Sequence, residues 1–128
     1  MSLPLGGIRV IDWTLWQMGP VASSLLGDLG ADVIKIEQRK IGDPGRAVKR
    51  VRGRQMVFPS GRNAYFETNN RNKRGLALDL SKPAGQEIMY RLVKKSDVFL
   101  QNYRHGVAER LHMDYATLSK INPRIMEG

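Results

Sequence analysis

The chain has 128 residues, of which 41% are hydrophobic and 26% charged, and its formal net charge is +9. A chain of this length is one domain or part of one, and it can bury a hydrophobic core. Its composition excludes disulfides and thiolate metal sites, because it has no cysteine. No apolar run approaches the roughly 18 residues of a membrane span, and no signal-peptide pattern opens the chain, so we expect a cytoplasmic protein.

The first elements form a strand–helix–strand unit. Residues 8–12 contain the β-branched residues typical of a buried strand, and Gly19-Pro20 marks the start of a helix. The predicted buried face of this helix repeats at helical spacing and comprises Val21, Leu25, Leu26 and Leu29. Gly30 provides a left-handed stop, and residues 32–37 form a second strand. This spacing indicates two parallel strands joined by a right-handed crossover.

A long basic loop is predicted at residues 39–63, where glycine and proline interrupt any periodicity. Its first part contains one acid, Asp43, among the cations Arg39, Lys40, Arg46, Lys49, Arg50, Arg52 and Arg54. Such a cluster indicates an anionic partner. Nucleic acid is one candidate, but aromatic residues make up only 7% of the chain and do not interleave with the cations. Acidic surface elsewhere in the protein is another.

A second cationic cluster, at residues 71–74, runs directly into an apolar strand at 76–80. We expect this arrangement to place positive charge at the mouth of the sheet, where it can hold an anionic ligand. Ser81 and Pro83 then open a helix. Its predicted buried face comprises Ile88, Met89, Leu92 and Val93.

The last elements complete the pattern of an α/β fold. Residues 97–100 form a fourth strand, and Asp114 caps a short helix that Asn122-Pro123 ends. Residues 124–128 resemble the start of another strand, so we expect the domain to continue beyond them. The order of elements predicts a Rossmann-like parallel sheet with flanking helices, of which this chain is a truncated part.

Two patterns narrow the chemistry. The dinucleotide fingerprint G-x-G-x-x-G is absent, which argues against a nicotinamide or flavin cofactor, and no metal-ligand spacing occurs. Gln17 lies in the first strand-to-helix turn, and a helix N-terminus favours phosphates and developing oxyanions. Its amide is therefore either a group that holds a reacting carbonyl or an ordinary exposed turn amide.

Five motifs extend through nearly all of the chain. They are GIRVID at 7–12, QMGP at 17–20, LGADVIKIE at 29–37, NKR at 72–74 with LDL at 78–80, and NYRHGV at 102–107. In this order and spacing they resemble the family III CoA-transferases, a group that also includes carnitine and bile-acid CoA-transferases and α-methylacyl-CoA racemases. The individual motifs are short, and it is their combination that is specific.

The resemblance implies an enzyme that moves CoA from an acyl-CoA to a carboxylic acid. In such enzymes an aspartate attacks the thioester to give an acyl-aspartyl anhydride, and the CoA thiolate then forms an enzyme–CoA thioester. No aspartate of this chain occupies the place of that nucleophile, and we interpret Asp12 and Asp79 as structural carboxylates at strand ends. The resemblance thus implies that residues 1–128 are the N-terminal part of the large domain of an interlocked homodimer, inactive alone. CoA is a substrate, and no permanent cofactor is implied.

The resemblance also assigns residues to CoA. Gln17 and Met18 would lie at the thioester end, with Gln17 supporting the chemistry, and Arg110 would meet a phosphate. The remaining residues assigned to CoA are Gln38, Arg39, Leu78, Asp79, Leu80, Ser81, Asn102, Tyr103 and Arg104. Three positions depart from the family pattern: Gln38, where many relatives carry arginine; Ser81, where lysine is frequent; and His105, where proline is usual.

Two alternatives remain open at this stage. A 2-methylacyl-CoA racemase would remove and return an α-proton, which requires an acid/base pair instead of a nucleophile. The Gln17-Met18-Gly19-Pro20 turn favours the transferase branch. A basic nucleic-acid-binding domain is the alternative from another class, and it would bind duplex DNA with a steep salt dependence and would not bind CoA.

Overall fold

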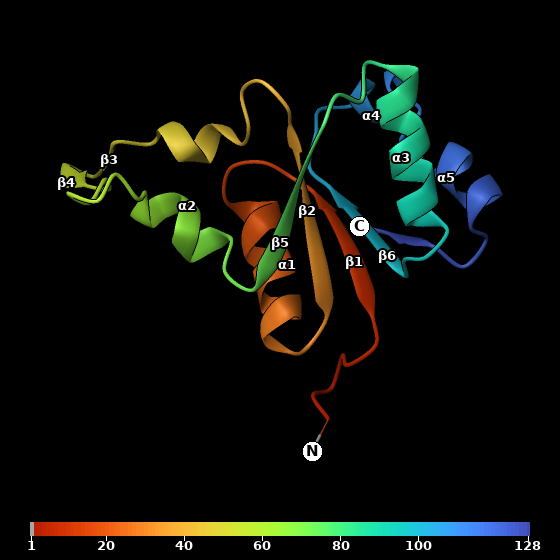
Figure 1. Ribbon diagram of the computed structural model, residues 1–128, viewed down its shortest axis with the longest axis horizontal. Coiled ribbons are helices and arrows are strands. Elements are labelled where there is room, and N and C mark those ends of the chain that lie inside the picture. Colours follow the sequence, from red (N-terminus) through yellow and green to blue (C-terminus); the bar gives the residue numbers. More distant parts are fainter. Residues whose placement is uncertain (1) are drawn as a thin grey trace.

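Five parallel strands form the centre of the protein, which a computed structural model describes over residues 2–128 (Figure 1). In spatial order they are β5 (Lys73–Leu78), β2 (Asp32–Gln38), β1 (Arg9–Trp13), β6 (Val98–Gln101) and β7 (Met126–Glu127). All four pairings are parallel. The predicted α/β fold with a Rossmann-like parallel sheet is thus confirmed, and β1, β2 and β6 lie within one residue of their predicted positions.

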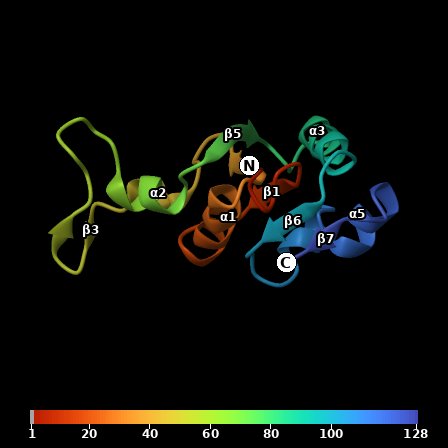
Figure 2. The same cartoon turned by 90° about the horizontal axis from the view of Figure 1, so that it is seen from below.

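Helices cover both faces of this sheet. The helix α1 (Met18–Asp28) lies on one face, and α3 (Pro83–Val93), α4 (Val107–Arg110) and α5 (Tyr115–Ile121) lie on the other (Figures 1 and 2). Alternate side chains of each strand point to opposite faces, so Ile11 packs towards α3 and Val10 towards α1. Both faces of β1 and β2 are consequently buried, and apart from Asp12 and Lys35 their buried residues are apolar. Within residues 2–128, no helix is long and apolar enough to cross a membrane.

The predicted buried face of α1 is wrong for two of its residues. Leu25 and Leu29 are 52% and 46% exposed, and the helix packs instead through Pro20, Ser23 and Ser24. The reason is polar: the Ser23 hydroxyl donates to the buried Asp12 carboxylate (2.7 Å), and the Ser24 hydroxyl donates to a backbone carbonyl (2.7 Å). Small hydrogen-bonding side chains therefore replace leucine at this interface. In α3, Met89 and Val93 are buried as predicted, whereas Ile88 is exposed.

The connection between β2 and β5 projects away from the sheet (Figures 1 and 2). We predicted a loop at 39–63, but it contains a 3₁₀ helix (η1, Pro44–Ala47) and a hairpin of β3 (Arg50–Val51) and β4 (Arg54–Gln55). An additional helix, α2 (Ala64–Asn69), follows directly. Asn63 caps α2 by accepting a hydrogen bond from the Phe66 N–H (3.0 Å). Six residues are too few for periodicity to reveal a helix.

The cationic cluster at 71–74 does not lie at the mouth of the sheet, so that prediction is wrong. The strand β5 begins at Lys73, which places these cations at its amino end. Each has an acidic partner: the pairs are Arg71–Asp28, Lys73–Asp12 and Arg74–Asp32, with N–O separations of 2.5, 2.8 and 2.7 Å. These pairs join the start of β5 to α1, β1 and β2, and they neutralise the charge of the cluster within the chain.

Candidate functional site

A pocket lies at the carboxyl ends of the strands, between the sheet and α4. It encloses about 260 Å³, slightly less than the roughly 300–1,000 Å³ of typical ligand sites, so it would hold part of a large ligand. Its lining residues are Trp13, Ile36, Glu37, Gln38, Leu78, Asp79, Leu80, Ser81, Tyr103, Val107, Arg110 and Leu111. The strand order reverses between β1 and β6, and this switch point is where open parallel sheets bind ligands.

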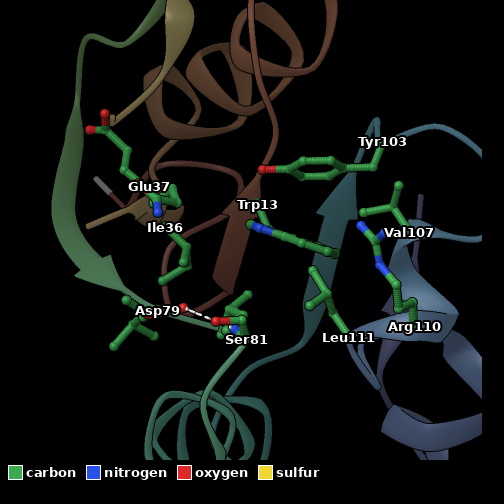
Figure 3. A pocket seen from close by; sticks show the side chains of 12 residues that line it. Trp13, Ile36, Glu37, Asp79, Ser81, Tyr103, Val107, Arg110 and Leu111 are labelled. Atoms are coloured by element: carbon green, nitrogen blue, oxygen red, sulfur yellow. Dashed lines mark hydrogen bonds between the residues drawn. The ribbon is translucent and has the colours of Figure 1, made fainter. Parts of the chain in front are cut away.

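One side of the pocket is aromatic. The Trp13 and Tyr103 rings are stacked, with centroids 4.2 Å apart, and both belong to residues that end or follow a strand (Figure 3). Burial raises the pKa of Tyr103 to about 12, and the Asp43 and Asp12 carboxylates contribute in the same direction. The phenol is therefore protonated at neutral pH. This side offers a flat apolar surface with one hydroxyl.

The opposite side carries a carboxylate among cations. Asp79 accepts hydrogen bonds from the Ser81 N–H (3.1 Å) and hydroxyl (2.5 Å), and these lower its pKa below the ordinary value. The positive charges of Lys82 and Lys40 also lower the pKa of Asp79. Arg110 lies across the pocket from Asp79 and Ser81 (Figure 3). An ionised acceptor, an aromatic surface and several cations are groups that bind a nucleotide-like ligand.

Side chains from other segments of the chain hydrogen-bond to the backbone of the turn between β1 and α1. The Asn102 amide accepts from the Leu15 N–H and donates to the Leu15 carbonyl, both at 2.8 Å. The Trp16 N–H donates to Asp43 (3.1 Å). Gly19 lies so close to Thr14 that a Cβ atom at position 19 would stand 2.5 Å from the Thr14 Cβ. This packing fixes the backbone, while Gln17 remains exposed.

Two buried ion pairs lie beneath this turn. Lys35 is 2.9 Å from Asp43 and also donates to the Thr14 carbonyl (3.0 Å). Lys73 is 2.8 Å from Asp12, which also accepts from the Thr14 and Ser23 hydroxyls. Burial lowers the pKa of Lys73, and the Asp12 carboxylate opposes that shift. The network joins the turn to β2, to β5 and to the projecting segment. Among residues 2–128, no group of three or more potential ligands could hold a metal ion.

The sequence model described as CoA-transferase family III matches residues 5–127. The chain belongs to CoA-transferase family III. Formyl-CoA:oxalate CoA-transferases of Afipia carboxidovorans and Bradyrhizobium diazoefficiens are each 36% identical to it over 126 residues, 98% of this chain and 28% of theirs. The family III chain thus spans less than a third of the length of these relatives.

Solved structures agree with this assignment. Rv3272 from Mycobacterium tuberculosis, in its orthorhombic form, is 36% identical with a TM-score of 0.85, over 98% of this chain and 34% of that one. A CAIB/BAIF family protein from Brucella suis is 34% identical with a TM-score of 0.85, over 99% of this chain and 33% of that one. A short chain dehydrogenase/reductase family protein, at 14% identity and a TM-score of 0.51, shares the fold alone.

Of the twelve residues that the motifs assign to CoA binding, seven line the pocket. They are Gln38, Leu78, Asp79, Leu80, Ser81, Tyr103 and Arg110. Arg39 and Arg104 are exposed and outside the lining, and Gln17 and Met18 lie on the turn, also outside it. Asn102 joins the two regions through Leu15. The structure therefore gathers most of the assigned residues at one edge of the sheet, and their contacts with CoA remain predictions.

Five lining residues were not predicted, namely Trp13, Ile36, Glu37, Val107 and Leu111. Trp13 had a readable signal, because it is an aromatic residue at the carboxyl end of a strand and directly before the Gln17 turn. Val107 and Leu111 had no such signal in the sequence. Val107 begins the short α4 and Leu111 follows it, and a helix of four residues is not apparent from periodicity.

Proposed function

We propose that residues 1–128 form the N-terminal, CoA-binding part of an acyl-CoA transferase, which moves CoA from an acyl-CoA to a carboxylic acid. The observation that carries the proposal is the pocket itself. It combines a stacked Trp13–Tyr103 surface with the ionised Asp79 and the guanidinium of Arg110 at the switch point of the sheet. Family membership supplies the reaction class, and the pocket supplies a place for the nucleotide end of CoA.

The proposal gives roles to the apolar lining, to Asp79 and to Arg110. The adenine lies on the apolar lining near Leu78 and Leu80, and a ribose hydroxyl donates to Asp79. The phosphates meet Arg110, whose planar fork suits phosphate oxygens. The thioester end then extends along the same edge towards Gln17.

The chemistry would use an aspartate outside residues 1–128. Its carboxylate oxygen attacks the thioester carbon, the C–S bond breaks, and CoA leaves as a thiolate. The thiolate attacks the aspartyl carbonyl of the mixed anhydride, which releases the donor acid and leaves CoA on the enzyme. The acceptor carboxylate repeats the sequence in reverse and departs as its CoA thioester. In this scheme the exposed Gln17 amide donates a hydrogen bond to the oxygen that gains negative charge.

The test is a transfer assay with the whole protein, which we propose is a cytoplasmic homodimer. Formyl-CoA and oxalate are the first pair to assay, because relatives 36% identical to this chain carry that name. We expect an oxalate-dependent loss of formyl-CoA with formation of oxalyl-CoA, detected by mass spectrometry, or the same exchange with another acid in a panel. A protein that binds no CoA and transfers none to any acid would contradict the proposal.

Two other outcomes would assign a different function. Exchange of the α-hydrogen of a 2-methylacyl-CoA with solvent deuterium, without transfer to an acid, would identify the racemase activity of the same family. Salt-sensitive binding of duplex DNA without CoA binding would identify a nucleic-acid-binding protein.

A further inference from the structure

We infer that Asn102 is a positioning residue of the proposed transferase, which holds the Gln17 turn through the backbone of Leu15. This role differs from the direct contact with CoA that the motifs assign to Asn102. The inference rests on the proposed function for its catalytic consequence. Its structural part depends only on the hydrogen bonds at the turn.

Both polar atoms of the Asn102 side chain are used within the protein. Oδ1 accepts from the Leu15 N–H and Nδ2 donates to the Leu15 carbonyl, each at 2.8 Å and across 87 residues of sequence. The last backbone pair between β1 and β6 is Trp13 with Gln101. The Asn102 amide thus hydrogen-bonds to Leu15, two residues beyond the last backbone pair on the β1 side.

The neighbouring residues of the turn are held in the same way. Lys35 donates to the Thr14 carbonyl (3.0 Å), and Asp43 accepts from the Trp16 N–H (3.1 Å). Trp16 has a φ of 68°, a left-handed conformation that is uncommon for a bulky residue and needs support from its surroundings. Three consecutive residues are therefore fixed by side chains from three different segments. A fixed backbone that presents exposed side chains is the arrangement that preorganised catalytic groups require.

Asn102 is the member of this set that can be tested cleanly. Lys35 and Asp43 form a buried ion pair, so the loss of either would leave an unpaired charge in the core. Asn102 is neutral. A matched control exists in Asn122, whose Nδ2 donates to the carbonyls of Val93 and Ser96 at 2.9 and 2.8 Å. These carbonyls precede β6, at the end of the sheet away from the turn.

The experiment compares the whole protein with its Asn102→Ala and Asn122→Ala variants. Hydrogen exchange followed by mass spectrometry should show lost protection at residues 14–18 in Asn102→Ala only. The kcat for CoA transfer should fall by about 10²-fold in Asn102→Ala, because small misplacements of catalytic groups have effects of this size. The Kd for CoA, measured by calorimetry, should stay within about twofold of that of the parent protein, since ground-state binding is retained. Asn122→Ala should keep its kcat.

Other outcomes would overturn the inference. A weakened Kd for CoA with kcat preserved would make Asn102 a ligand contact, and equal loss of kcat in both variants would indicate general destabilisation. If Asn102→Ala is insoluble, Asn102→Asp keeps the size and the acceptor, loses the donor to the Leu15 carbonyl, and is judged by the same measurements. If the parent protein transfers no CoA, the proposed function is wrong. If the parent is active and Asn102→Ala has the same kcat, only this inference is wrong.

Discussion

Single residues decide where charge is buried in this chain. The side chains of the Lys35–Asp43 and Lys73–Asp12 pairs are at most 3% exposed. Removal of charges from water is costly, and an ion pair is tolerated in a core only when further hydrogen bonds satisfy its atoms. Lys73 meets this condition, since it also donates to the Pro20 carbonyl (2.8 Å). We therefore expect each pair to behave as a unit: loss of one member strands a charge, and loss of both does not.

Lys73→Met should destabilise the protein by about 3–5 kcal/mol, because Asp12 would remain buried and charged without its cation. Urea denaturation would measure the change. The double variant Asp12→Asn/Lys73→Met should recover part of the loss, since it removes the stranded charge. Arg62→Met provides a control: the Arg62–Glu67 pair is exposed, so its loss should have little effect. A double variant less stable than Lys73→Met would argue against this account of the network.

At the scale of elements, the pocket depends on how closely α3 approaches the end of β5. Gly85 lies in the first turns of α3 and is buried. A Cβ atom at this position would stand 2.1 Å from the Asp79 carbonyl oxygen, which is backbone and cannot rotate away. Glycine is thus required here for close approach, although it weakens a helix interior. The approach fixes Asp79 and the turn after it at the pocket.

Gly85→Ala should therefore destabilise the protein by about 1–3 kcal/mol, as overpacking does, despite the higher helix propensity of alanine. It should also weaken CoA binding, because α3 would move away from Asp79. Thermal unfolding and calorimetry would measure the two effects. Gly75→Ala is the matched control, since a Cβ atom there meets nothing within 4 Å. Stabilisation by Gly85→Ala would show that the helix end adjusts freely.

The elements themselves were largely predictable, and the exceptions have physical causes. The apolar runs at β1, β2 and β6 mark buried strands directly, so their positions agree to within one residue. The buried face of α1 was misassigned because a carboxylate on the neighbouring strand, Asp12, selects serine over leucine at the interface. The sequence of α1 alone does not contain that partner. The cations at the start of β5 were wrongly expected at the mouth of the sheet for the same reason, because their acidic partners lie on other elements.

At the scale of the whole molecule, position in the sheet made the site partly predictable. Residues that end or follow strands, such as Leu78 and Tyr103, meet at one edge because parallel strands end together. Trp13 also lies at a strand end, but that position alone does not show which face of β1 the side chain occupies. The hydrogen bonds between Asn102 and Leu15 could not be predicted, because 87 residues of sequence separate the two. The number of cations did not locate the site, because some lie on the projecting hairpin and others, such as Arg74, have acidic partners within the chain.

This distribution of charge leads to a prediction about which cations hold CoA. Arg110→Ala should raise the Kd for CoA by about 10–100-fold, because a hydrogen bond to a charged group contributes about 1.5–3 kcal/mol. Arg50, Arg52 and Arg54 are exposed on the β3–β4 hairpin, which projects away from the sheet (Figure 1). Their combined replacement by glutamine should leave that Kd unchanged, although it removes three positive charges.

Calorimetry on the whole protein at two salt concentrations would measure both effects, since screening weakens exposed charge interactions. Arg91→Ala is the control for a lost arginine, because Arg91 lies on α3 outside the pocket and is 4.0 Å from Glu87. If the hairpin variant weakens CoA binding as much as Arg110→Ala does, the ligand is attracted by the general positive field of the protein. If only Arg110→Ala does so, the guanidinium at the pocket recognises it.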